Sequence, residues 1–248
     1  MSRSLMCHVV AGYPDADTCL QLMRGLQEAG ATAIEVQIPF SDPIADGETI
    51  MQANDAALAG GMTTTGSFSL IAKAREQGLD RDVYIMSYLQ KVQHQGIEAF
   101  CRAAADCGAR GLIIPDVPYE SPEHGQLVSL VRKYGLELVP VLSPGMSSKR
   151  LAALLRAGPK YVYVTSRRGI TGSSYAGTAE LDRFVAEVRR GSNATVMIGF
   201  GIATAKDVDD VLRYGDIAVV GSAIIKKLQS SGLGKTLEYA AGLTGAKL

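Results

Sequence analysis

The 248-residue sequence has no tryptophan, only 6% aromatic residues and no excess charge of either sign. Because 25 Lys and Arg balance 25 Asp and Glu, no overall field attracts nucleic acid or an anionic membrane surface. The sequence also lacks a run of about 18 apolar residues and an N-terminal signal-peptide pattern. We therefore expect a cytoplasmic protein that binds neither membranes nor nucleic acid and that holds any anionic ligand by local contacts.

Metal-binding and common catalytic motifs are missing as well. The four cysteines form no CxxC pair and the three histidines are scattered, so no metal site is predicted. Cys101 and Cys107 do not lie on adjacent turns of one helical face, which favours buried, reduced thiols. The motifs GxGxxG, GxxxxGK(S/T), HExxH and GxSxG do not occur, which removes the usual dinucleotide, nucleotide triphosphatase, zinc protease and serine hydrolase functions.

What the sequence does have is a repeating pattern of short apolar runs separated by segments with helical spacing. Runs that are apolar on both faces are typical of parallel strands covered by helices. The pattern predicts a single (β/α)8 TIM barrel over residues 1–248, with two helices near 47–60 and 67–76 in an elaborated loop. The eight runs are Leu5–Val10, Ala33–Ile38, Val83–Met86, Gly111–Ile114, Glu137–Leu142, Tyr161–Thr165, Thr195–Ile198 and Ile217–Val220.

Two acidic residues stand where a barrel carries its chemistry. Glu35 lies inside an apolar strand and Asp46 in the loop that follows it. Two carboxylates at one barrel mouth can divide acid and base work, because their environments separate their pKa values. A structural ion pair for Glu35 and a turn or helix-cap role for Asp46 are the alternatives. Glu48, two residues from Asp46, is expected to raise the pKa of Asp46 by like-charge repulsion.

Glycine-rich segments follow the sixth, seventh and eighth runs, at 169–172, 199–201 and 221–222. Glycine lets the backbone approach a phosphate closely, and amides at a helix start donate to it. These are the usual phosphate positions of a TIM barrel, so the sequence predicts a phosphate site. Tyr163 either packs in the core or forms a wall for an aromatic ligand. The function that these exclusions and the phosphate site leave is that of a cofactor-free lyase or isomerase acting on a phosphorylated substrate.

Motifs along about the whole chain resemble those of the tryptophan synthase α-subunit family. The Pro-Phe-Ser-Asp-Pro segment with Glu35 before it is the most specific of them. The matching segments are Ala11–Pro14, Pro39–Pro43, Ala45–Gly47, Ile114–Pro118, Ser166–Arg167, Gly169–Gly172, Gly199–Ile202 and Val220–Ala223.

The resemblance implies a lyase of tryptophan biosynthesis that cleaves indole-3-glycerol phosphate to indole and glyceraldehyde 3-phosphate. Glu35 and Asp46 match the catalytic acid–base pair of the family, and neither a metal nor an organic cofactor is expected on this chain. The resemblance also implies an α2β2 complex with a β subunit that carries pyridoxal phosphate. The positions that match substrate-binding residues are Tyr163, Thr171, Gly172, Phe200, Gly201, Gly221 and Ser222.

Some positions depart from the family pattern. Gln37 stands where the family usually has Gly, Glu48 where it has Pro, and His8 where it has an apolar or aromatic residue. By the same resemblance, we expect the helix that precedes the first strand in the family to be missing or shortened. These departures keep two alternatives open: a stand-alone lyase that releases free indole, and a weakly active phosphate-binding allosteric partner.

Overall fold

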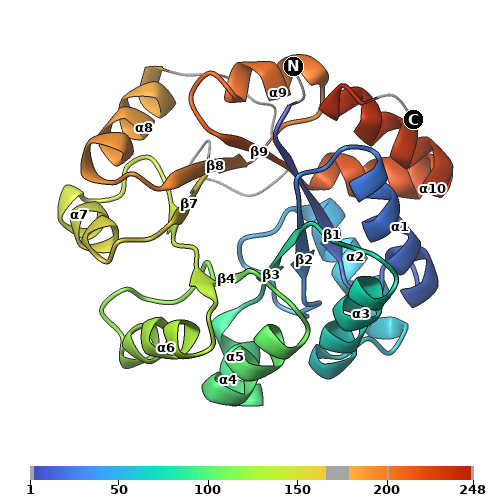
Figure 1. Cartoon of the computed structure of the whole chain (residues 1–248), viewed down its shortest axis with the longest axis horizontal. Helices are drawn as coiled ribbons and strands as arrows, with labels where there is room; N and C mark the ends of the chain where they lie inside the picture. The colour runs from blue at the N-terminus through green and yellow to red at the C-terminus, as the bar shows by residue number, and fades with distance from the viewer. Residues whose placement is uncertain (1–2, 166–178, 200, 247–248) are drawn as a thin grey trace.

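The computed structural model describes residues 3–165, 179–199 and 201–246, which form a sheet of parallel strands surrounded by helices (Figure 1). The sheet order is β5-β4-β3-β2-β1-β9-β8-β7-β6. The strands are β1 (Leu5–Val10), β2 (Ala33–Gln37), β3 (Asp82–Met86), β4 (Gly111–Ile113), β5 (Glu137–Leu138), β6 (Val141–Leu142), β7 (Tyr161–Thr165), β8 (Thr195–Gly199) and β9 (Ile217–Val220).

The predicted fifth strand, 137–142, is divided into β5 and β6 at Pro140, which has no N–H to donate to a ladder. Its first half pairs with β4, and Val139 N donates to Leu112 O at 2.9 Å. Its second half pairs with β7, and Tyr163 N donates to Pro140 O at 2.9 Å. The two ends of the sheet thus meet in one continuous segment, so the predicted closed barrel is confirmed.

Helices begin where capping residues satisfy their first amides. Asp15 accepts from Thr18 N before α1, Ser121 caps α6, and Thr204 forms a capping box before α9. The predicted pair of helices between the second and third strands is present as α2 and α3, shifted by a few residues. The helices are α1 (Ala16–Glu28), α2 (Glu48–Ala59), α3 (Thr64–Glu76), α4 (Leu89–Gln95), α5 (Ile97–Asp106), α6 (Pro122–Lys133), α7 (Ser148–Arg156), α8 (Ala179–Gly191), α9 (Ala205–Val211) and α10 (Ser222–Thr244).

Alternation along each strand sends side chains to two cores. On β2, Ile34 and Val36 face the helices, whereas Ala33 faces the barrel interior. The interior is packed by large side chains, including Tyr84, Met86 and Met197. Residues two apart on a strand lie on the same face, so Glu35 and Gln37 point into the barrel like Ala33. On β1, His8 points into the barrel like Met6.

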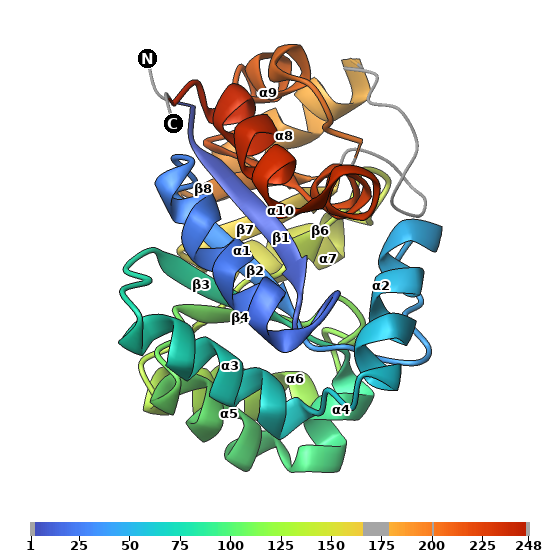
Figure 2. The same cartoon turned by 90° about the vertical axis from the view of Figure 1, so that its right-hand side faces the viewer.

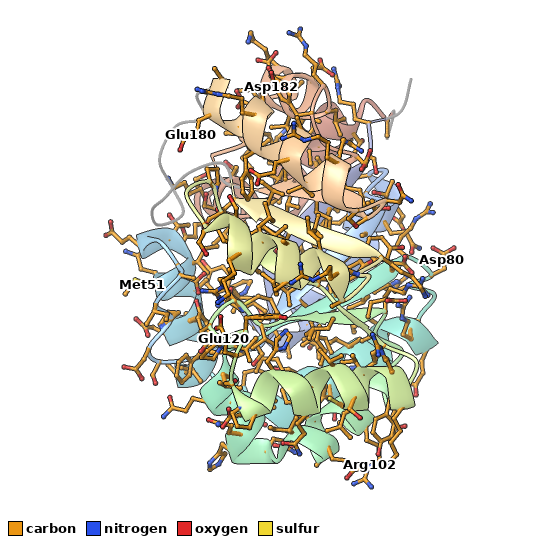
Figure 3. All side chains as sticks on the ribbon, turned by 90° about the vertical axis from the view of Figure 1, so that its left-hand side faces the viewer. Met51, Asp80, Arg102, Glu120, Glu180 and Asp182 are labelled. Carbon is orange, nitrogen blue, oxygen red and sulfur yellow. The ribbon has the colours of Figure 1, made fainter. Side chains whose placement is uncertain are left out.

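The two ends of the barrel differ in what lies over them. Figure 2 shows β1 running toward the side on which α2 lies, with both termini at the opposite end. Charged side chains such as Asp80, Arg102 and Glu120 project from the periphery (Figure 3). In the part of the chain that the structure describes, no helix is long and apolar enough to cross a membrane.

Candidate active site

Glu35 is a buried acid, 4% exposed, that projects from β2 into the barrel. Its partner across the parallel ladder is His8 of β1, and the two residues are in direct register. His8 Nδ1 and Glu35 Oε2 are 2.9 Å apart, and His8 is itself only 7% exposed. An acid in an apolar strand therefore has a titratable partner, the His8 imidazole, inside the barrel.

Asp46 belongs to the loop between β2 and α2 and is 7% exposed. The Gln37 side-chain amide donates to Asp46 Oδ2 at 2.6 Å and to Asn54 Oδ1 at 3.3 Å. Asn54 of α2 also accepts from Phe40 N at 3.0 Å, so it fixes the start of the loop. Ala45 N donates to Tyr88 Oη at 3.2 Å, which fixes the residue before Asp46. The carboxylate is thus held by Gln37 of β2 and by Tyr88, and its loop is held by Asn54 of α2.

Burial is the main reason that the pKa of Asp46 is raised above its ordinary value. Hydrogen bonds from Gln37 and Tyr88 and the charge of His8 oppose that shift, whereas the charge of Glu35 adds to it. The expected repulsion from Glu48 is not among these causes. Glu48 lies at the start of α2, where its carboxylate accepts from Gln52 Nε2 at 3.2 Å. The direction of the shift is as predicted, but its cause is desolvation.

Tyr163 extends from β7 into the same interior, and its pKa is raised well above 10 by burial and by the charges of Glu35 and Asp46. Gly199 on the neighbouring strand leaves room for its ring, because a Cβ at that position would come within 2.7 Å of Tyr163 Cζ. Tyr163 therefore packs against the interior core and also lines the cavity at the mouth of the barrel.

A cavity of about 510 Å³ opens at the carboxyl ends of the strands and contains both predicted acids. Its wall is apolar on the side of β3 and β4, whereas the segment after β6 contributes Ser143, Met146 and Arg150 of α7. Its remaining lining contains the glycine-rich turns after β8 and β9. The predicted site residues that line it are Glu35, Asp46, Tyr163, Gly201, Gly221 and Ser222, together with His8.

Of the predicted phosphate loops, those after β8 and β9 contribute Gly201, Gly221 and Ser222 to the lining of this cavity, whereas the loop at 169–172 lies outside the described residues. Gly201 has φ +74°, a left-handed conformation that glycine adopts without strain. Gly221 precedes α10, which begins at Ser222, so the first amides of α10 are at the cavity wall. Such amides attract anions. Thr171, Gly172 and Phe200 lie outside the described residues.

Other residues that support the site were not singled out from the sequence as its members. Tyr88 and Asn54 hold the Asp46 loop, and no local motif marks them. Asp116, for which turn and site roles competed, accepts from Leu89 N at 2.8 Å and thereby supports the start of α4. Among the described residues, no group of three or more His, Cys, Asp and Glu is placed to hold a metal ion.

The fold is a parallel β/α barrel, and one cavity at its mouth is lined by two buried carboxyl groups and by the start of α10. Comparison with known proteins agrees, since the sequence model for the tryptophan synthase alpha chain matches residues 2–243. The chain belongs to the tryptophan synthase alpha chain family.

Individual relatives support this assignment. The tryptophan synthase alpha chain of Caulobacter sp. (strain K31) is 40% identical over 224 residues, which are 90% of this chain and 81% of the relative. Tryptophan synthase of Saccharomyces cerevisiae is 34% identical over 99% of this chain, which corresponds to 35% of the longer yeast protein.

Solved structures give the same result. A tryptophan synthase chain from Mycobacterium tuberculosis superposes with a TM-score of 0.90 at 30% identity, covering 98% of this chain and 92% of that one. A chain from the tryptophan synthase α2β2 complex of Pyrococcus furiosus superposes with a TM-score of 0.88 at 28% identity, covering 99% and 100%. The predicted TIM barrel and family membership are thereby confirmed.

Proposed function

We propose that this chain is a carbon–carbon lyase that cleaves indole-3-glycerol phosphate to indole and glyceraldehyde 3-phosphate in tryptophan biosynthesis. The observation that carries this proposal is the placement of Glu35 and Asp46 in one cavity with the glycine-lined start of α10. The cavity has the size of a small-molecule site. One end offers acid–base groups and the other offers backbone donors, which matches a substrate with an aromatic ring and a phosphate.

Asp46 is the group that handles the indole N–H. As the ring becomes an indolenine, Asp46 accepts or holds the N–H proton, and it returns that proton when indole forms. The hydrogen bond from Gln37 and that from Tyr88 favour the ionised carboxylate, which is the form that can accept a proton.

Glu35 acts on the other reacting atoms. It delivers a proton to ring C3, then accepts the proton of the side-chain hydroxyl as the C–C bond breaks and the aldehyde forms. One carboxyl group can serve both steps because it is first an acid and then a base. Burial of Glu35 inside the barrel shields both transfers from bulk water.

The phosphate and the ring would be held by the remaining proposed residues. Gly201, Gly221 and Ser222 would bind the phosphate together with Thr171, Gly172 and Phe200, and Tyr163 would contact the substrate. Backbone amides at the start of α10 supply donors, and Arg150 of α7 lines the same cavity with a cationic side chain. No metal or organic cofactor takes part on this chain in the proposed reaction, which we place in the cytoplasm.

A β subunit carrying pyridoxal phosphate is the proposed partner, in an α2β2 assembly like that named for the Pyrococcus furiosus neighbour. Ile44, in the loop between β2 and α2, is 75% exposed, and Met51 of α2 is 43% exposed. Large apolar side chains exposed beside the cavity mouth are typical of a surface that a protein partner covers.

Indole release from indole-3-glycerol phosphate tests the proposal. The purified protein is assayed alone and with a tryptophan synthase β subunit, beside Glu35→Gln and the control Glu76→Gln at an exposed position on α3. We expect indole release that rises with the β subunit, survives in the control and falls by about 10²-fold or more in Glu35→Gln. No release under either condition contradicts the proposed reaction, and release that is indifferent to the β subunit contradicts the proposed partner.

A further inference from the structure

We propose that His8 is a positioning residue that stores the proton Glu35 delivers, so that the two side chains act as one acid–base unit. This inference rests on the proposed function and adds a residue to it. Three observations carry it: the register of β1 and β2, the charges that face the imidazole, and the proton balance of the cleavage.

The backbone fixes the His8–Glu35 contact. The two residues face each other across a parallel ladder in which Cys7 pairs with Ile34 and Val9 with Val36. Both side chains are buried, and Nδ1 and Oε2 lie 2.9 Å apart, within the range of a hydrogen bond. A proton can therefore pass between them without movement of either strand.

The groups facing the ring favour the imidazolium. Glu35 approaches from β2 and Asp46 from the loop after it, and both attract a positive charge. Tyr163 from β7 is neutral, and from β9 the ring meets the backbone of Gly221. Burial lowers the pKa of His8, but the charge and hydrogen bond of Glu35 and the charge of Asp46 outweigh it, so the pKa is raised above its ordinary value.

The proton balance gives this arrangement a purpose. A Glu35 carboxylate paired with an imidazolium has no proton of its own for ring C3, but a protonated His8 Nδ1, 2.9 Å away, supplies one. That proton passes through Glu35 to C3 while Asp46 takes the N–H proton. Glu35 then accepts the hydroxyl proton, the bond between C3 and the side-chain carbon breaks, and Asp46 returns its proton to nitrogen. Transfer from Glu35 back to Nδ1 restores the starting state, with no net proton gained or lost.

The second ring nitrogen remains protonated throughout this cycle. His8 Nε2 is buried and has no hydrogen-bond partner among the described residues. No described contact therefore holds the ring in a tautomer that would oppose proton transfer at Nδ1. In this cycle the ring loses its positive charge when Nδ1 gives its proton to Glu35, and it regains that charge when Glu35 returns a proton.

Nuclear magnetic resonance of protein labelled with ¹⁵N in the histidine rings tests the pair without any assay of activity. His8, His94 and His124 give three sets of signals, and the set absent from His8→Asn is that of His8. We expect a doubly protonated His8 ring at pH 7 in the wild-type protein and a lower pKa of His8 in Glu35→Gln. A neutral ring at pH 7, or a pKa unchanged by Glu35→Gln, would overturn the proposal.

Two substitutions then separate proton storage from orientation. His8→Phe removes both, whereas His8→Asn keeps an N–H near Glu35 but cannot store a proton. In both variants we expect kcat to fall about tenfold or more, with the alkaline limb of its pH profile moved to lower pH, because Glu35 then lacks the proton stored on His8. We expect KM to stay closer to wild type in His8→Asn. His94→Gln, at an exposed position, is the matched control.

The outcomes distinguish this inference from the proposed function. Suppose that wild-type protein releases indole and that the alkaline limb of His8→Asn, unlike that of His8→Phe, coincides with the wild-type limb. His8 then only orients Glu35 and stores no proton. If wild-type protein releases no indole, the proposed function fails, and the ring signals still decide whether His8 and Glu35 share a proton.

Discussion

The Gln37 side-chain amide donates a 2.6 Å hydrogen bond to Asp46 Oδ2 from a position that is fully buried. Gln37 is the last residue of β2, and Asp46 lies nine positions later in the loop. The hydrogen bond thus ties the loop to the rigid strand that also carries Glu35. The two acids are placed by one strand, and each has its own buried partner.

Gln37→Leu should shift the acidic limb of the activity profile upward. Asp46 must be ionised to accept the indole proton, so activity rises as pH increases through the Asp46 pKa, which lies above 3.8. Because the Gln37 hydrogen bond lowers that pKa, its removal raises the pKa of Asp46 further. Measurement of kcat against pH checks this, and a limb that stays in place would contradict it.

Asp46→Asn should abolish most of the indole release while the fold is kept. An amide cannot take the N–H proton, so we expect kcat to fall by about 10²-fold or more. Asp42→Asn is a matched control in the same loop, since Asp42 is exposed and accepts a 2.5 Å hydrogen bond from the hydroxyl of its neighbour Ser41. Equal losses in the two variants would mean that loop structure, not proton transfer, explains the effect.

Gly199→Ala should displace the Tyr163 ring and weaken substrate binding. The new methyl group would come within 2.7 Å of Tyr163 Cζ, so the ring must move into the cavity. Overpacking of this kind costs about 1–3 kcal/mol, and we expect KM to rise about tenfold. Gly125→Ala is the control, because an added Cβ there meets nothing within 4 Å. The control should retain wild-type kinetics and gain about 0.5–1 kcal/mol in its free energy of unfolding.

Thr244→Val should lower the free energy of unfolding without affecting the site. Thr244 Oγ1 donates to Ala29 O at 2.5 Å, which joins the end of α10 to the end of α1, and it is 2% exposed. Valine has a similar shape but no donor, so we expect a loss of about 1–2 kcal/mol. Urea unfolding measures it, with Ser230→Ala at an exposed position of α10 as the control. A loss in the control as large as that in Thr244→Val would count against this explanation.

The thiols should be inert in the native protein. Burial raises the pKa of Cys7 to about 12 and those of Cys19, Cys101 and Cys107 to about 11. At pH 8 less than about 1% is thiolate, and the thiolate is the reactive form. Ellman's reagent should therefore detect four thiols in urea and almost none in native protein. A rapid native reaction would show that at least one cysteine is accessible.

The fold was predictable because parallel strands buried on both faces leave a strong pattern in the chain. All eight runs became strands, and the two helices between the second and third strands formed. The break at Pro140 was not expected, although proline cannot donate to a ladder. Strand boundaries depend on tertiary pairing, and local composition does not record such pairing.

The site was predictable in part. Glu35 and Asp46 could be found because an acid in an apolar strand and one in the next loop are locally unusual. The partners of these acids could not be predicted, because they are distant in the sequence. His8 contacts Glu35, 27 residues later, through the register of β1 and β2, and Tyr88 contacts Asp46, 42 residues before it. Their residue types are unremarkable until the ladder brings them together.

The division of the closing strand at Pro140 gives the barrel a seam. Around most of the wall, neighbouring strands are joined by ladders, as in the five-residue pairings of β1 with β2 and of β7 with β8. Between β4 and β7 the described sheet instead has two short pairings, of β4 with β5 and of β6 with β7, and the covalent chain from β5 to β6 connects them. Chain continuity takes the place of a ladder there, so a nick at this point would open the cylinder into a curved sheet with two free edges.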